Sequence, residues 1–287
     1  MVIIDICKSK NVIQTFRNNF ANHSPRHFLT LCKLLGIKTV QTPYLNVGKI
    51  EIDTRGKTIS ESILATGQYQ FQIMQAVADK LVSPLPQFVN IGANIGTTIL
   101  NAWSIGFTNF VAVEPVIFNY NLLLKNLATH NISSKNLNVA CGQELGSAMI
   151  NLHPSSGGRH SLKDQFRGGQ NQEVSVIKLD SLQIKTPFFL WVDTEGFELE
   201  VLKGGLETIR SLCLGACVEV SPNISGPGAA CEVLELLNEV FSTHYDVLGL
   251  PYDLSALKNK IQCNELSQCD VLSFRPQNFN KIIDDLP

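Results

Sequence analysis

Residues 88–98 place a short apolar run directly before a turn with two glycines, and a new apolar periodicity follows the turn. The run favours a buried strand, and the spacing of Ile95 and Ile99 favours a helix. Strand, glycine turn and helix in this order build the nucleotide pocket of doubly wound α/β proteins. We expect Gly92 to let the chain leave the strand sharply and Gly96 to let the helix pack closely on the strand. The N–H groups of the first helical turn are then available to a ligand.

The spacing of this turn differs from that of the dinucleotide fingerprint. The pattern G-x-G-x-x-G keeps its second glycine bare so that a pyrophosphate can approach the backbone, whereas Asn94 occupies that position here. A phosphate-cradling loop with Gly-Lys-Ser/Thr is also absent from the sequence. The turn therefore favours a nucleoside ligand without phosphates over NAD or ATP. The alternative is an α/β turn that binds no ligand.

Composition limits the class of protein. The chain has 287 residues, of which 44% are hydrophobic, and a formal net charge of −2. This length fits one large domain or a domain with an appendage. The charge gives no electrostatic reason to expect a nucleic-acid partner. No apolar run is as long as a membrane span, and residues 1–10 make a poor signal peptide because Asp5 interrupts their apolar run.

The cysteines favour a reducing compartment. Eight of them are scattered along the chain without a C-x-x-C pair. A chain of this size does not need disulfide staples, so we expect free thiols packed as small hydrophobes in a cytoplasmic protein. Paired Cys or His spacing is also missing, and we expect no metal site.

Residues 1–85 predict a mostly helical N-terminal extension. Pro43, Gly48 and Gly56 interrupt the pattern, and a helical region over residues 60–82 is broken at Gly67. We expect this extension to cover one side of the sheet or to shape a substrate entrance. Residues 86–287 then form the ligand-binding domain.

The next strand delivers a carboxylate to the same edge of the sheet. Residues 109–113 predict a buried strand that ends at Glu114, about 20 positions beyond the glycine turn, where such folds bind ribose hydroxyls. A helix is predicted over residues 117–129. A third strand over residues 136–141 ends at Ala140 and Cys141, where small residues leave room for a flat adenine ring.

A polar loop separates two further strands. Residues 148–152 and 173–179 predict a hairpin or an added edge of the sheet. Residues 153–172 between them form a long segment of the kind that often serves as a lid, and a solvated loop is the alternative. The segment's candidate functional side chains are His153, Arg159, His160 and Arg167.

Two carboxylates follow another buried strand. Residues 187–192 lead directly to Asp193 and Glu195, which are costly if buried without partners and are therefore candidate site residues. One of them could instead cap the helix predicted over residues 197–209. A strand over residues 213–220, a helix near 228–240 and strands near 245–248 and 270–274 complete the expected elements.

Taken together, these motifs resemble the FkbM-type S-adenosylmethionine-dependent methyltransferases over residues 66–222. The segments that carry the resemblance are VNIGANIG at 89–96, VEP at 113–115 with Asn119 and Tyr120, KLDSL at 178–182, DTEGFELEVLKG at 193–204 and VE at 218–219. The resemblance implies a class I methyltransferase fold, in which a seven-stranded sheet with an antiparallel last strand carries helices on both faces. It also implies S-adenosylmethionine as cofactor. The expected cofactor-binding residues are Asn90, Gly92, Asn94, Gly96, Glu114, Ala140, Cys141 and Asp193.

The chain departs from the family pattern at three positions. Asn90 stands where the family usually has an acid, Trp191 where it usually has Lys, and Gln70 follows Tyr69 where Glu is common. These differences concern the acceptor more than the cofactor.

The resemblance implies methyl transfer to an acceptor that the sequence does not identify. We expect O-methylation of a sugar, lipid or secondary metabolite. The alternatives are N-methylation and a non-catalytic binding module. An alcohol must lose a proton as it is methylated, and the candidate bases are His160, then Glu195, with Asp193 mainly in a cofactor-binding or positioning role.

Overall fold

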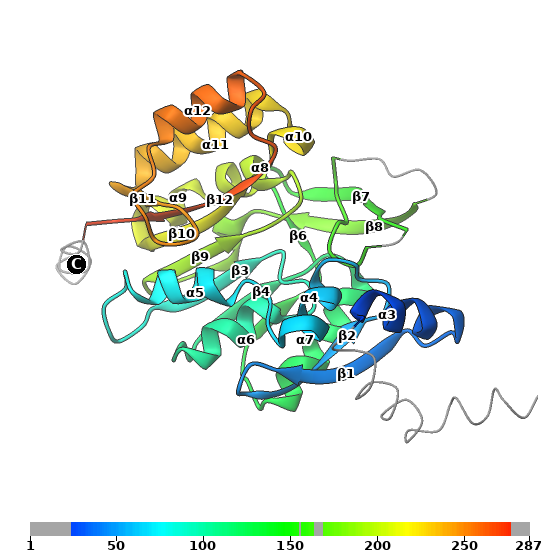
Figure 1. Ribbon diagram of the computed structural model, residues 1–287. Helices are drawn as coiled ribbons and strands as arrows, with labels where there is room; N and C mark the ends of the chain where they lie inside the picture. Colours follow the sequence, from blue (N-terminus) through cyan, green and yellow to red (C-terminus); the bar gives the residue numbers. More distant parts are fainter. Residues whose placement is uncertain (1–23, 155, 164–168, 277–287) are drawn as a thin grey trace, which may run out of the picture.

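A seven-stranded sheet forms the centre of the computed structural model, which describes residues 24–154, 156–163 and 169–276 (Figure 1). Strand β12 is antiparallel to both of its neighbours, and the other pairings are parallel. The predicted class I sheet with an antiparallel last strand is therefore confirmed. In spatial order the strands are β11 (Thr243–Tyr245), β12 (Cys269–Phe274), β10 (Cys213–Val220), β9 (Phe188–Val192), β3 (Gln87–Ile91), β4 (Phe110–Val113) and β5 (Lys135–Leu137).

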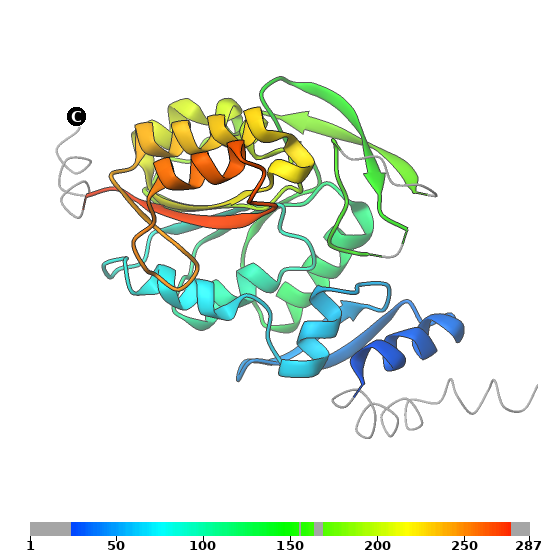
Figure 2. The ribbon, with the colours of Figure 1, turned by 45° about the horizontal axis from the view of Figure 1, so that its top comes forward.

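Helices cover both faces of this sheet, which can be seen in both views (Figures 1 and 2). Because both faces are covered, β9 and β4 are apolar throughout, and all their residues are buried. One apolar core lies beneath α8 (Glu198–Gly204), α9 (Leu206–Leu212), α11 (Pro227–Val240) and α12 (Leu254–Gln262). The other lies beneath α5 (Phe71–Ala78), α6 (Thr97–Ser104) and α7 (Ile117–Thr129).

The N-terminal part contains a β-hairpin that the sequence analysis missed. Strands β1 (Thr39–Tyr44) and β2 (Gly48–Asp53) pair antiparallel between α3 (Pro25–Leu34) and α4 (Ile59–Thr66). The prediction of a mostly helical extension is therefore wrong for this stretch. Every second residue of β1 is buried, and this period of two is typical of a strand. Over only six residues, such a period is hard to distinguish from a helical pattern in the sequence. Residues 1–23 lie outside the described residues.

Buried amides attach this hairpin to the sheet domain. The Asn126 side chain on α7 donates to the carbonyls of Glu51 and Ile95, at 3.0 and 2.8 Å, and accepts the Glu51 N–H at 2.7 Å. The Tyr44 hydroxyl donates to Asn101 Oδ1 on α6 at 2.7 Å. These bonds satisfy buried polar groups on both sides, so they favour one fixed position of the hairpin. The division of the chain near residue 85 remains a prediction.

A second, three-stranded sheet lies beside the first (Figure 1). It consists of β6 (Ala140–Cys141), β8 (Gln170–Ile177) and β7 (Gly146–Leu152), and its β7–β8 hairpin was predicted. The single strand predicted over residues 136–141 is wrong, because the chain leaves the large sheet after β5. At that point the Asn138 side chain donates to the carbonyls of Glu114 and Pro115, at 2.8 and 3.0 Å.

The helix predicted over residues 197–209 is divided into α8 and α9 at Gly205. A side chain at Gly204 would meet the Gly142 carbonyl oxygen at 2.0 Å, so α8 ends against the turn that follows β6. Helices α10 (Pro222–Ser225) and α12 were not predicted. In the described part of the chain, no helix has the length and apolar character needed to cross a bilayer.

Gly96 has a different packing partner from the one expected. Its φ of +93° lies in the region that favours glycine. A Cβ at this position would lie 2.9 Å from Leu123 Cδ1 on α7. The bare Cα therefore allows α6 to begin close to α7. Helix α6 does contact β3, as predicted, but the residue that Gly96 itself faces is Leu123.

Replacement Gly96→Ala should lower the free energy of unfolding by about 1–3 kcal/mol, because it adds backbone strain and crowds Leu123. Denaturant unfolding followed by circular dichroism measures the change. Gly146→Ala is the matched control, since Gly146 has no heavy atom within 4 Å of its Cβ position. Equal stability of Gly96→Ala and the wild type would contradict this account.

Candidate functional site

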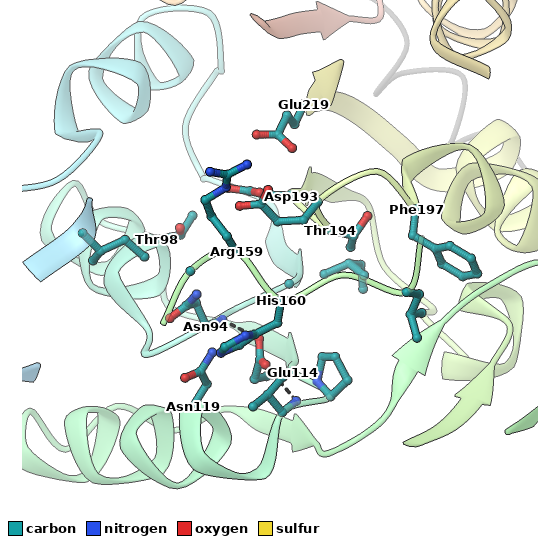
Figure 3. Close-up of a pocket in the computed structure, with 18 of the residues that line it drawn as sticks. Asn94, Thr98, Glu114, Asn119, Arg159, His160, Asp193, Thr194, Phe197 and Glu219 are labelled. Atoms are coloured by element: carbon teal, nitrogen blue, oxygen red, sulfur yellow. Dashed lines mark hydrogen bonds between the residues drawn. The ribbon is translucent and has the colours of Figure 1, made fainter. Parts of the chain in front are cut away.

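A cavity of about 210 Å³ opens where β3, β4, β9 and β10 end (Figure 3). Its wall comes from the glycine turn, the small sheet and the N-terminal part. Thr58, Ile59 and Tyr69 are its N-terminal lining residues. The carboxyl edge of a doubly wound sheet is where such folds bind ligands, so this cavity is the candidate site.

The glycine turn brings two chain segments unusually close. Gly92 has a φ of +85°, and a Cβ there would lie 1.8 Å from the Asp193 carbonyl oxygen. The Asp193 N–H in turn donates to the Ile91 carbonyl at 3.0 Å. Only glycine fits this approach, and it sets Asp193 directly beside the turn.

The Glu114 carboxylate joins the ends of two neighbouring strands. It accepts the Asn94 N–H at 2.8 Å and the Val116 N–H at 2.9 Å. Burial raises the pKa of Glu114 to about 7, although these two N–H bonds and the Asn119 side chain oppose the shift. An ionised carboxylate can accept about four hydrogen bonds, so it retains capacity for donors in the cavity.

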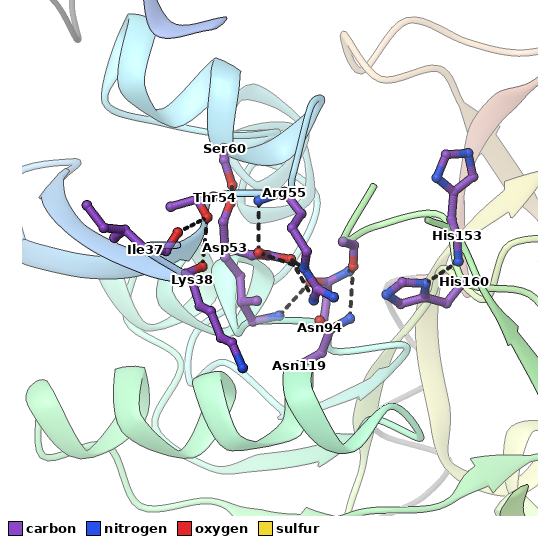
Figure 4. Close-up of polar contacts among 12 residues, drawn as sticks. Ile37, Lys38, Asp53, Thr54, Arg55, Ser60, Asn94, Asn119, His153 and His160 are labelled. Carbon is purple, nitrogen blue, oxygen red and sulfur yellow. Dashed lines mark hydrogen bonds and ion pairs between the residues drawn. The ribbon is translucent and has the colours of Figure 1, made fainter. Parts of the chain in front are cut away.

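One short segment between β7 and β8 is held against this wall (Figure 4). The side-chain amides of Asn94 and Asn119 both donate to the Gly157 carbonyl, at 3.2 and 2.9 Å. On the other side, a Cβ at Gly157 would lie 2.7 Å from Asp53 Oδ2, and Asp53 pairs with Arg55 at 3.0 Å. The segment thus bridges the sheet domain and the N-terminal part.

His160 lines the cavity with a neutral ring. Its Nδ1 accepts the His153 N–H at 2.9 Å, so the proton of the neutral ring lies on Nε2. Nε2 is buried and has no partner among the described residues. Burial, with smaller effects of Arg55 and His153, lowers the pKa of His160 to about 4.

The turn after β9 presents its carboxylates in different ways. Glu198 accepts the N–H groups of Thr194 and Gly196 and the Thr194 hydroxyl, each at 3.0 Å, and so stabilises the turn. Glu195 lines the cavity with a φ of +53°, which is strained for a residue with a side chain. Its carbonyl accepts the Ser161 hydroxyl at 2.7 Å.

Three carboxylates follow one another along the edge of the sheet. Asp193 directly follows β9, Glu219 lies near the end of β10, and Asp270 lies at the start of β12, in register with Glu219. We call these three residues the acid row. Burial and the neighbouring carboxylates raise the pKa of Asp193 and Glu219 well above their ordinary values, and that of Asp270 to about 6.

Most of the predicted site residues meet at the cavity. Those that line it are Gly92, Asn94, Glu114, Ala140, Cys141, Arg159, His160, Asp193 and Glu195. Asn90 and Gly96 lie outside the cavity wall; Asn90 is fully buried on β3, between Ala112 and Trp191 of the flanking strands. Arg167 lies outside the described residues.

Four residues without a predicted site role also line the cavity, namely Tyr69, Asn119, Glu219 and Asp270. Glu219 was recognisable as an acid at the end of a buried strand. Asp270 was not, because its position depends on the register of an antiparallel strand.

Comparison with known proteins identifies the family. A family model described as the methyltransferase FkbM domain matches residues 90–247, more than half of the chain. Among proteins with curated functions, none matches the sequence.

Three solved structures illustrate the range of similar folds. An FkbM methyltransferase from Methylobacillus flagellatus is 14% identical, with a TM-score of 0.35, and the match covers 88% of this chain and 72% of that protein. The N-terminal domain of human METTL16 is 13% identical, with a TM-score of 0.42 and coverage of 94% and 95%. The Thermus thermophilus 16S rRNA methyltransferase RsmC is 10% identical, with a TM-score of 0.43. Of this chain 83% is covered, but it spans only 50% of RsmC.

The acid row should make stability depend on pH. A raised carboxyl pKa contributes stability that is present below the unfolded value and is lost as pH rises through the folded value. For Asp270 this window runs from the ordinary 3.8 to about 6. Asp270→Asn should therefore exceed the wild type in unfolding free energy by about 1–3 kcal/mol at pH 8, and by much less at pH 4.

Urea unfolding of the ligand-free protein at pH 4 and pH 8 measures this difference. Glu207→Gln is the control, because it removes one exposed carboxylate that does not line the cavity. A variant Asp270→Asn that is less stable than the wild type at pH 8 would contradict the argument.

Proposed function

The chain belongs to the FkbM methyltransferase family, whose cofactor is S-adenosylmethionine, and from this premise we propose that it methylates a hydroxyl oxygen of a sugar, lipid or secondary metabolite. One observation carries the proposal. The carboxylates of Asp193 and Glu195, which follow β9, and of Glu219 on β10 line the cavity that the glycine turn borders. Such groups are suited to accept the proton that an alcohol must lose.

The residues at the glycine turn fit the cofactor. Two buried polar atoms in this wall, Asn119 Oδ1 and His160 Nε2, have no partner among the described residues, and Glu114 can accept further donors. Glu114 would hold the ribose hydroxyls, and Ala140 and Cys141 would flank the adenine. When bound, S-adenosylmethionine supplies an activated methyl group. The cavity wall orients the acceptor beside it and excludes water.

We assign the role of general base to Glu195, with Asp193 in a positioning role. Both line the cavity, and Glu195 sits on a strained turn of the kind that functional sites retain. His160, the base expected ahead of Glu195 from the sequence, is less suited to this role. Its Nδ1 lone pair is occupied by the His153 N–H, and its lowered pKa makes proton uptake unfavourable at neutral pH. His160 is therefore assigned to hydrogen-bond donation through Nε2.

We also propose that the N-terminal part shapes the acceptor entrance and that the protein is cytoplasmic. Thr58, Ile59 and Tyr69 line the cavity, which supports a role of the N-terminal part in shaping the acceptor entrance. The described cysteines are all free, which supports a cytoplasmic, reducing location.

Glu114→Gln should weaken S-adenosylhomocysteine binding by about 1–3 kcal/mol, because charge-assisted hydrogen bonds to the ribose are lost. Wild-type affinity should also rise between pH 6 and pH 8 as Glu114 ionises, and the variant should lose this rise. Isothermal calorimetry measures both effects, and NAD should not bind. Glu144→Gln, which changes an exposed carboxylate, is the control. Unchanged affinity in Glu114→Gln would remove Glu114 from the cofactor site.

Glu195→Gln should lower the single-turnover rate of methyl transfer by about 10²–10⁴-fold while cofactor affinity is nearly kept. His160→Ala should keep the shape of the wild-type pH–rate profile. A rise in the wild-type rate near pH 6.5 that disappears in His160→Ala would return the role of base to His160. Wild-type rates in both Glu195→Gln and Asp193→Asn would instead indicate catalysis by positioning alone.

The acceptor class is tested with methyl-labelled S-adenosylmethionine. The protein is incubated with a panel of glycans, lipids and small alcohols, and mass spectrometry locates the transferred methyl. We expect the label on oxygen. Label on nitrogen only would replace the proposal with N-methylation.

A further inference from the structure

The acid row lies on the acceptor side of the cavity. Glu114 and the glycine turn belong to β4 and β3, whereas Glu219 and Asp270 belong to β10 and β12, beyond β9 in the sheet. Adjacent strands are about 4.8 Å apart, so the row extends by roughly 10 Å from Asp193 to Asp270. These carboxylates are therefore displaced from the part of the wall assigned to the nucleoside.

The charges around the cavity are unbalanced. The described lining residues include the carboxylates of Glu114, Asp193, Glu195, Glu219 and Asp270, but Arg159 supplies the one guanidinium. Arg159 is exposed at the rim. Like charges on directly opposed residues of paired strands destabilise a sheet, and Glu219 and Asp270 form such a pair. In the described lining, carboxylates therefore outnumber cationic side chains five to one, and this favours positively charged ligands, S-adenosylmethionine included.

One carboxylate oxygen of the acid row has no hydrogen-bond partner in the described part of the chain and is a candidate contact for a cationic group. Glu219 is 5% exposed, and although its Oε1 accepts from the Gln268 side chain, its Oε2 has no partner among the described residues. His160, which is outside the acid row and 9% exposed, also presents the unpartnered Nε2 in the wall of the same cavity. Buried polar atoms without partners are costly, so the Glu219 oxygen indicates a hydrogen-bond donor, and the His160 N–H an acceptor, on the molecules that the cavity receives.

An ammonium group fits the acid row better than a metal ion does. Within the described residues, no group of three or more His, Cys, Asp or Glu side chains is arranged to hold a metal ion. An ammonium group offers three donors around a compact charge, which matches carboxylates that approach from several strands. The ring of Tyr69 lies in the same wall, and aromatic faces attract such cations.

We propose that Glu219 and Asp270, assisted by Asp193, bind an ammonium group of the methyl acceptor. This inference rests on the proposed function, because it assigns the ammonium to the molecule that is methylated. An ammonium among carboxylates keeps its proton, since neighbouring negative charge favours the charged form. A protonated amine has no lone pair for methyl transfer. The ammonium therefore anchors the acceptor, and a hydroxyl of the same molecule is methylated.

Ligand-observed NMR on the S-adenosylhomocysteine-loaded protein and on the free protein tests this site without turnover. The probes are two matched pairs: glucosamine against N-acetylglucosamine, and ethanolamine against ethylene glycol. We expect saturation transfer to the two amines at millimolar concentration and at least tenfold less to their neutral partners. Glu219→Gln and Asp270→Asn should each reduce the amine signal at least fivefold.

Glu207→Gln, which removes an exposed carboxylate outside the cavity wall, should leave the amine signals unchanged. The inference is overturned if the amines give no signal, if the neutral probes bind equally well, or if Glu219→Gln binds the amines like the wild type. Failure of the proposed function is detected separately, by the methyl-transfer assay with labelled S-adenosylmethionine. In that case no acceptor gains a labelled methyl, even if the amines bind at the acid row.

Discussion

The hydrogen bonds of the Glu114 carboxylate hold the two halves of the site together. The Asn94 N–H belongs to the turn after β3 and the Val116 N–H to the start of the chain segment after β4, and one carboxylate accepts both. This bond pattern sets the turn in the left-handed conformation of Asn94, with a φ of +49°. The same conformation directs the Asn94 side chain to the Gly157 carbonyl. A residue expected only to bind a ribose is therefore also a structural bridge.

The cavity wall depends on segments that are distant in the sequence. The Gly157 carbonyl receives donors from Asn94 and Asn119, and the N-terminal part approaches it through Asp53. Asn126 in turn attaches the N-terminal hairpin to α7. Each of these amides would be costly if left unpaired in the interior, so the contacts reinforce one arrangement. The N-terminal part is thus a component of the site wall.

The acid row illustrates how a site can oppose stability. Burial raises the pKa of Asp193, Glu219 and Asp270, and neighbouring carboxylates, Glu198 among them, add to the shift, which means that their ionisation weakens the folded state. A core of this size tolerates such a loss because both faces of the sheet are filled with apolar side chains. The unfavourable charge is concentrated where a ligand can relieve it. The same carboxylates therefore determine both the pH dependence of stability and the charge of this part of the cavity.

The sequence by itself determined the parts of this protein that local patterns encode. The glycine turn, Glu114 at the following strand end, Asp193 and Glu195 after β9, and the family motifs were all recognisable, because each depends on residues adjacent in the chain. The break at Gly67 was also predicted, and Gly67 ends α4 in the left-handed conformation. Tertiary structure alone decided the partner of Gly96, the position of Asp270 and the departure of the chain from the sheet at Asn138. Those features depend on helix packing, on antiparallel register and on a side chain that binds backbone carbonyls 23 and 24 positions away. No local periodicity encodes such long-range contacts, which form only when the whole sheet has assembled.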